Sequence, residues 1–173
     1  MNITAIPSNA FNGQLIHLKV LTFQTCTLKK IGSGAFSRLK NLESLQFLYT
    51  CFESVPENAF SFDKKSEKPF ELTFDDYFDF NPNIFNEKSL LNIKRPTKLW
   101  LRMKPEIQYL NERVFLTFLS DNVNNFIVII DCSDCRNYWL RREPNRSSRV
   151  MGYKCSNDKS ITDQDNFKNC SNI

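Results

Sequence analysis

Glycine, histidine and long apolar runs are scarce in this sequence, and each scarcity excludes a class of protein. The 4 Gly of the 173 residues are scattered, so no glycine-rich loop that could cradle a phosphate is present. The single histidine, His17, has no nucleophile motif beside it, and a catalytic triad therefore has no support. No apolar stretch is long enough to cross a membrane. We therefore expect a protein that is not an enzyme, has no cofactor or metal, and has no membrane span.

The charge balance is too mild to indicate a nucleic-acid partner. The net charge is +4 and the isoelectric point is near 8.7. With 41% hydrophobic and 24% charged residues, the chain should form one globular core. Its first residues do not read as a signal peptide, because they lack a basic start and an apolar stretch.

An internal repeat is the strongest signal in the sequence. Segments 6–11, 31–36 and 55–60 share one phrase, an aliphatic residue followed four and five positions later by Ala-Phe, and their Phe residues are 25 and 24 positions apart. A second phrase, Leu-x-x-Leu-x-Phe, occupies 18–23 and recurs at 42–47. Regular spacing of this kind predicts stacked units that bury one shared core.

Later copies of the repeat are less regular. After an insertion rich in Lys and Ser from Ser61 to Pro69, strands are predicted at 72–74 and 99–101, with a final strand at 126–130. In the copy that follows the strand at 72–74, Ile84-Phe85 takes the place of the Ala-Phe pair, and Phe85 lies 25 residues after Phe60. Each copy also has a return segment, which leads back from one strand to the start of the next. The segment 109–115 is predicted to be the return segment of the copy that begins with the strand at 99–101.

The repeat matches the leucine-rich-repeat consensus, and the chain resembles the C-terminal part of an extracellular leucine-rich-repeat protein whose N-terminal part is missing. That resemblance implies an α/β fold, a leucine-rich-repeat solenoid of about five repeats with a curved parallel sheet and a disulfide-bonded C-terminal cap. Residues 1–130 would form the repeats and 131–173 the cysteine-rich cap. The Phe residues at 11, 36, 60 and 85 should stack along the convex side.

Four cysteines crowd the end of the chain, namely Cys132, Cys135, Cys155 and Cys170. Together with Trp139-Leu140 they resemble the C-terminal cap of that family, with two residues instead of one between the first two cysteines. The resemblance implies the pairs Cys132–Cys155 and Cys135–Cys170, although four cysteines allow three pairings. A zinc site and a thioredoxin-like redox pair are the alternatives that we considered less favoured. Cys26 and Cys51, which stand alone, are predicted to be buried structural thiols.

A narrower resemblance is carried by Cys132, Cys135, Trp139-Leu140 and the run Cys155-Ser156-Asn157-Asp158. In these residues the chain resembles arthropod secreted proteins that are named after the non-catalytic subunit of the oplophorus-type luciferin monooxygenase. The resemblance covers the cap and the later repeats, and it implies no light-producing chemistry.

The predicted compartment is extracellular. Three glycosylation sequons begin at Asn2, Asn145 and Asn169, and the cysteine set is even and clustered. The densest basic stretch includes Arg141, Arg142 and Arg146, which would suit an anionic glycan, although a solvated cap surface is the favoured interpretation. The acidic stretch 75–80 offers three carboxylates, but it lacks a calcium-loop signature and is read as a solvated strand edge.

A partner site is predicted on the concave face of the sheet. Strand side chains alternate between faces, so the residues between the inward Leu and Phe positions must face outward. Leu48, Asp75, Trp100 and Arg102 are the candidates for that site, with Ile127 and Ile129 nearest the cap. Two functions follow as hypotheses: recognition of a protein ligand, or a non-catalytic accessory subunit in a secreted enzyme complex.

The cap pairing can be tested directly. The two bonds implied by the resemblance would enclose loops of 24 and 36 residues, each contributing roughly 3–4 kcal/mol in the chain-entropy account. Peptide mapping without reduction should recover Cys132 linked to Cys155 and Cys135 linked to Cys170. Four reduced thiols, or bound zinc, would contradict the prediction.

Overall fold

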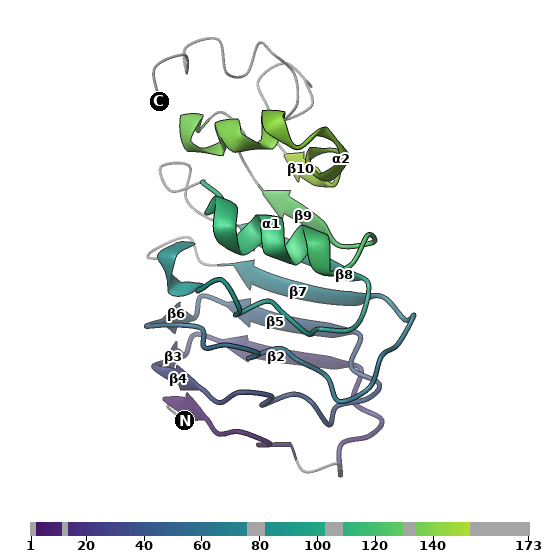
Figure 1. The fold of residues 1–173 in the computed structure, drawn as a ribbon. Coiled ribbons are helices and arrows are strands. Elements are labelled where there is room, and N and C mark those ends of the chain that lie inside the picture. Colours follow the sequence, from purple (N-terminus) through teal and green to yellow (C-terminus); the bar gives the residue numbers. More distant parts are fainter. Residues whose placement is uncertain (1–2, 12–13, 76–81, 103–108, 130–133, 153–173) are drawn as a thin grey trace.

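The fold is built on a six-stranded sheet in which every strand pair is parallel (Figure 1). A computed structural model describes residues 3–11, 14–75, 82–102, 109–129 and 134–152. Along the sheet the strands follow chain order: β2 (Val20–Gln24), β5 (Ser44–Leu48), β7 (Phe70–Asp75), β8 (Thr97–Arg102), β9 (Phe126–Ile129) and β10 (Val150–Gly152). The predicted α/β class with a parallel sheet is confirmed.

Short elements lie between the strands and cover one side of the sheet. Two further parallel sheets have two strands each, β1 (Ala5–Ile6) with β4 (Lys30–Ile31) and β3 (Thr27–Leu28) with β6 (Cys51–Phe52). The helical segments are η1 (Pro82–Ile84), α1 (Glu112–Asp121), η3 (Cys135–Arg142) and α2 (Pro144–Ser147). The helix α1 lies over the sheet near β8 and β9, and η3 and α2 follow at the end opposite β1 (Figure 1). Within the described residues, no helix combines the length and apolarity needed to span a bilayer.

Strand register brings equivalent positions of each repeat side by side. Leu21 pairs with Leu45, Leu45 with Leu72 and Leu72 with Leu99. Two residues later the same strands align Phe23, Phe47, Phe74 and Leu101. Except for Leu21, which is half-buried, all of these side chains are buried. Because alternate strand residues share a face, one face of the sheet carries the core.

Stacked phenylalanine rings fill that core in two columns. In the strands, the ring centroids of Phe23 and Phe47 lie 5.3 Å apart, and those of Phe47 and Phe74 also lie 5.3 Å apart. In the return segments, Phe36 stacks on Phe11 at 5.7 Å and on Phe60 at 6.0 Å. The return-segment column continues through Phe85, which contacts Phe74 at 5.2 Å and Phe115 of α1 at 6.0 Å. Each ring thus bridges neighbouring units, as expected from the spacing of the Phe residues.

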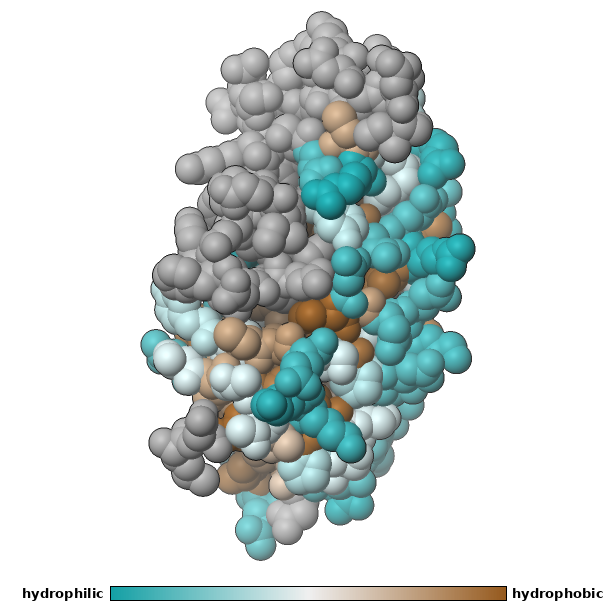
Figure 2. Space-filling view, turned by 90° about the vertical axis from the view of Figure 1, so that its left-hand side faces the viewer, coloured by the Kyte–Doolittle hydropathy of each residue, from teal (hydrophilic) through white to brown (hydrophobic). Residues whose placement is uncertain are grey.

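In each of the first three copies, the residue directly before the Ala-Phe pair has a left-handed backbone conformation, with a positive φ. Asn9, Gly34 and Asn58 occupy the same place in three copies and have φ values of 55°, 61° and 55°. Only glycine adopts this conformation without strain, and asparagine tolerates it better than most residues. The turn therefore explains why the repeat places Asn or Gly there, directly before the Ala-Phe pair, which is buried in the second and third copies. On the edge of the molecule that lies on the left of Figure 1, hydrophobic side chains form a band beside a hydrophilic flank (Figure 2).

Two predictions about the last strands are wrong. The strand at 126–130 is not the final strand, because β10 pairs with β9 and extends the sheet into the segment predicted to be the cap. Ile127 and Ile129 do not face the concave side, because they pair with the core residues Leu99 and Leu101 and are themselves buried in the core. In a run of five apolar residues, both alternating phases fit the pattern, so the sequence alone does not choose between them.

The left-handed turn gives a test of the repeat. A Cβ at Gly34 would meet its nearest neighbouring atom at 3.7 Å, so space is available and only the backbone conformation resists substitution. We expect Gly34→Val to lower the free energy of unfolding by about 1–2 kcal/mol, and Gly34→Asn to lower it much less. The exposed neighbour Ser33 provides the control, Ser33→Val. Equal losses for Gly34→Val and Ser33→Val in urea unfolding would contradict this account.

Candidate functional site

The face of the sheet opposite the core, here called the open face, is polar at the β2 end and apolar at the β10 end. One row of aligned residues crosses all six strands on this open face, and it reads Thr22, Gln46, Thr73, Trp100, Val128 and Met151. Its N-terminal half is polar, and Thr22 donates a hydrogen bond to Gln46 at 3.3 Å. Its C-terminal half is apolar. In this half Met151 is 44% exposed and Trp100 is half-buried, whereas Val128 is buried. The exposed apolar surface around Trp100 and Met151 is therefore the candidate partner surface.

Trp100 lies between two cations on β8. The Nζ atom of Lys98 is 4.3 Å from the ring centroid, and the Cζ atom of Arg102 is 5.3 Å from it. Both cations lie on the open face, because residues two apart on a strand share a side. The indole is half-buried, so part of its surface is accessible while cation–π contacts hold it in place.

The structure brings the four predicted partner-binding residues together. Leu48 pairs with Asp75, and Asp75 pairs with Arg102, so these three form a second row beside Trp100. The Nη1 atom of Arg102 lies 3.2 Å from Oδ2 of Asp75. Leu48 is half-buried and Arg102 is exposed. The ion pair and the cation–π contact together fix the position of Arg102, which reduces the entropy that binding would cost.

Two exposed apolar residues of the open face are absent from the sequence prediction. Phe126 is 37% exposed and pairs with Lys98, while Met151 is 44% exposed and pairs with Val128. Val128 is buried but does not belong to the main core cluster, as expected for a residue on the other face of the sheet. The signal that could have found Phe126 is the phase of its strand, because aligning Ile127 with Leu99 places Phe126 outward.

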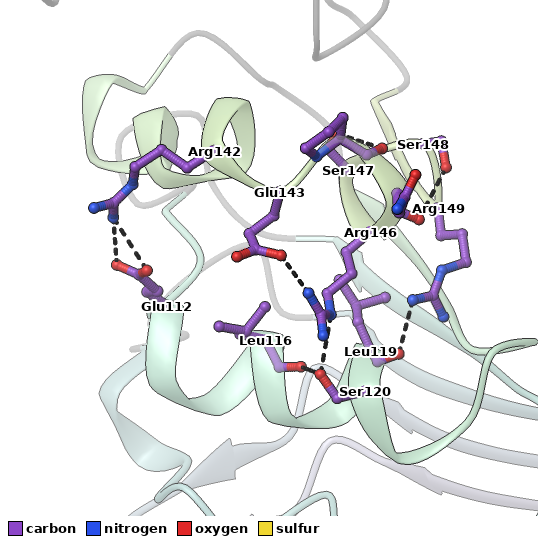
Figure 3. Close-up of polar contacts among 12 residues, drawn as sticks. Glu112, Leu116, Leu119, Ser120, Arg142, Glu143, Arg146, Ser147, Ser148 and Arg149 are labelled. Atoms are coloured by element: carbon purple, nitrogen blue, oxygen red, sulfur yellow. Dashed lines mark hydrogen bonds and ion pairs between the residues drawn. The ribbon is translucent and has the colours of Figure 1, made fainter.

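Most arginines of the cap have structural partners (Figure 3). Arg142 forms hydrogen bonds to both carboxylate oxygens of Glu112 at 3.1 and 3.0 Å, and Arg146 pairs with Glu143 and donates to Ser120. Arg149 donates to four backbone carbonyls around the end of α1, including that of Leu119 at 2.8 Å. These contacts join η3, α2 and β10 to α1.

The proposed glycan site at Arg141, Arg142 and Arg146 would therefore have to compete with existing contacts. Arg142 and Arg146 already pair with carboxylates. Arg141 is exposed and lies over the ring of Tyr138 at 5.2 Å. The anionic partner of these arginines remains a prediction.

The short helix η3 anchors the cap through buried polar contacts. The indole Nε1 of Trp139 donates to the carbonyl of Leu110 at 2.9 Å, and the Leu110 amide donates to Oδ1 of Asn137 at 2.7 Å. Trp139 and Leu140 lie in this short helix and are buried. At the start of η3, Oδ1 of Asp134 accepts from the Arg136 amide at 2.9 Å and thus caps the helix.

The cysteines are only partly described. Cys135 is disulfide-bonded, while Cys132, Cys155 and Cys170 lie outside the described residues, so the pairing stays a prediction. Cys26 and Cys51 do not form a disulfide. The prediction that both are buried is wrong for Cys51, which is exposed, and Cys26 is only half-buried. The next residue, Phe52, contacts the core rings Phe47 and Phe74, and because successive strand residues point to opposite faces, Cys51 points to the surface.

The remaining predicted site residues can be placed briefly. Asn145 is exposed on α2, which suits a glycosylation acceptor, while Asn2 and Asn169 lie outside the described residues. His17 is exposed. Of the acidic stretch only Asp75 is described, and its carboxylate pairs with Arg102. In the described part of the chain, no group of three potential metal ligands comes together.

Comparisons with protein families, with curated proteins and with solved structures find no match to this chain. Function is therefore inferred from the geometry of the open face and of the cap.

The helix cap at Asp134 yields a pH-dependent prediction. Burial acts to raise the pKa of Asp134, but hydrogen bonds and the charge of Arg136 outweigh it, so the pKa lies below its ordinary value. A lowered pKa in the folded protein means that the ionised carboxylate stabilises the fold above the pKa of the unfolded chain, about 3.9. This contribution is lost as the pH falls through the lower pKa of the folded protein.

Asp134→Ala should therefore reduce the free energy of unfolding by about 1 kcal/mol at pH 7. The difference from wild type should shrink below pH 3, as measured by urea unfolding at both pH values. Glu67→Gln, at an exposed position of the insertion, serves as the control and should have little effect at either pH. A difference for Asp134→Ala that persists unchanged in acid would show that the charge does not contribute.

Proposed function

We propose that the repeat is a leucine-rich-repeat solenoid of about five units, closed at its C-terminal end by a disulfide-bonded cap. The proposal is supported by consecutive parallel strands whose aligned residues are 24 to 28 positions apart from β2 to β9. Stacked rings between units and the recurring left-handed turn add to that support. Resemblance to the extracellular family supplies the expectation of a secreted, glycosylated protein.

The function that the geometry supports best is recognition of a protein partner through the open face of the sheet. The observation that carries this proposal is the apolar half of that face, where Trp100, Phe126 and Met151 lie beside the pair of Asp75 and Arg102. Aromatic residues and arginine at the centre of a surface, surrounded by polar residues, are typical of binding hot spots.

A test of the proposal is pull-down from the extracellular fluid of the source organism, with the intact chain as bait. The expected result is the recovery of a protein partner that binds through the open face. A partner recovered at constant stoichiometry would favour the second hypothesis, the non-catalytic accessory subunit of a secreted enzyme complex. The cap resembles the arthropod secreted proteins that are named after the non-catalytic subunit of the luciferin monooxygenase. That resemblance supports the second hypothesis.

Trp100 provides the decisive substitution. Trp100→Ala should weaken partner binding by roughly 2 kcal/mol or more, because a half-exposed indole at the centre of the patch would be a hot spot. The melting temperature should change little, because the ring lies on the face opposite the main core. Thr22→Ala, in the same row at the polar end of the face, is the matched control and should leave binding unchanged.

The opposite pattern for Trp100→Ala would overturn this interpretation of the open face. A lowered melting temperature with intact binding would show that Trp100 contributes to stability and not to recognition. Isothermal titration with the captured partner and thermal denaturation by circular dichroism distinguish the two patterns.

A further inference from the structure

A small pocket lies where the lysine-rich insertion meets the segment that leads into β8. Its volume is about 240 Å³, below the range of pockets that hold drug-sized molecules and suited to a small group. Five of its ten lining residues are basic and one, Asp63, is acidic. The basic residues are Lys40, Lys64, Lys65, Lys68 and Arg95. This pocket is separate from the open face, since none of its lining residues belongs to a strand of the main sheet.

Arg95 is the unusual member of the pocket, because its side chain is only 2% exposed. Its Nη1 atom donates to the carbonyl of Leu42 at 2.5 Å, and Nε donates to the carbonyl of Lys68 at 3.3 Å. The rings of Phe62 and Phe70 flank the guanidinium at 5.0 and 5.5 Å. Backbone carbonyls and aromatic rings thus hold the group in one orientation.

The remaining nitrogen of Arg95, Nη2, is buried and has no hydrogen-bond partner among the described residues. A guanidinium has five N–H donors, and leaving buried donors unpaired is costly. No carboxylate of the described residues forms an ion pair with Arg95. Glu43 is near enough to influence the group, but its carboxylate pairs with Lys19 at 3.0 Å. The positive charge of Arg95 therefore lacks an anion at close range within the described part of the chain.

Four lysines line the pocket together with Arg95. Lys40, Lys64 and Lys68 are exposed and form no ion pair within the described residues, while Lys65 makes only a solvent-exposed contact with Glu67 at 3.6 Å. The loop that carries them is held in place, because the Ser66 amide donates to the Lys94 carbonyl and the Lys68 amide donates to the Ser66 hydroxyl. Several exposed lysines that line one small pocket attract an anion electrostatically.

We propose that this pocket binds a tetrahedral oxyanion carried on a larger molecule, either the sulfate ester of a glycan or a phosphate ester. Arg95, which lines the pocket, donates to the anion, and the lysines of the insertion bind it electrostatically. Such an anion would provide the partner that the buried guanidinium lacks, because arginine donors match the oxygens of sulfate and phosphate. The competing carboxylates, Asp63 and Glu67, are both exposed and therefore screened.

The first experiment compares thermal unfolding of the intact chain in sodium sulfate, sodium phosphate and sodium chloride at matched ionic strength. Sulfate and phosphate raise the melting temperature of most proteins over its value in chloride, because they are excluded from the protein surface. Specific binding therefore shows as a rise that is larger for the wild-type chain than for the double variant Lys64→Gln, Lys65→Gln, because a ligand of the folded state stabilises it. Titration calorimetry with a sulfated oligosaccharide and with a phosphorylated peptide then distinguishes the two sources. An equal rise for the wild-type chain and the double variant, with no heat of binding for either probe, would overturn the proposal.

The second experiment locates the site. The double variant Lys64→Gln, Lys65→Gln should weaken binding on the order of tenfold, because it removes two of the exposed cations from the pocket. The matched control, Lys29→Gln with Lys30→Gln, removes the same charge at β3 and β4 and should have a much smaller effect. If the control weakens binding equally, the interaction is general charge attraction and the proposed site is wrong.

Arg95→Lys provides a further check that does not depend on the lysines. It keeps the charge but removes the planar donor set, so binding should weaken while circular dichroism verifies the fold. If Arg95→Lys is unfolded, the lysine variants alone decide the outcome.

Discussion

The structure depends on the in-register stacking of one unit on the next. No single unit can bury its own phenylalanine, because each ring is covered by the rings before and after it. The contacts between Phe23, Phe47 and Phe74, each at 5.3 Å, are possible only while the strands remain aligned. A slip of one residue would turn these rings to the open face and expose them to water. Register, more than the stability of any one element, therefore defines the fold.

This constraint separates the two surfaces on which function is proposed. Positions that face the core are committed to packing, whereas the open face and the insertion between Ser61 and Pro69 are free to carry other chemistry. The open face has its apolar residues near the cap, and the insertion has its lysines around Arg95. Arg142, Arg146 and Arg149 join the cap to the helix α1.

The sequence predicts the repeated part of the fold well and the end of the sheet poorly, for physical reasons. Where Leu and Phe alternate with polar residues, as in β2 and β5, the pattern defines the face of each residue. In 126–130 every residue is apolar, so the phase of Ile127 and Ile129 is lost and Phe126 is missed. The contacts of Arg95 could not be predicted either, since they join residues up to 53 positions apart through backbone carbonyls.

The order of the strands has a consequence for synthesis of the chain. Every strand of the main sheet pairs with the strands that precede and follow it in sequence, so no unit waits for a distant segment before it can pair. A chain that leaves the ribosome from its N-terminus can add one unit at a time onto a surface that is already formed. Until β10 and η3 arrive, however, the growing end presents unpaired strand edges and bare phenylalanine rings. The described residues that follow β9 therefore protect the nascent sheet from aggregation.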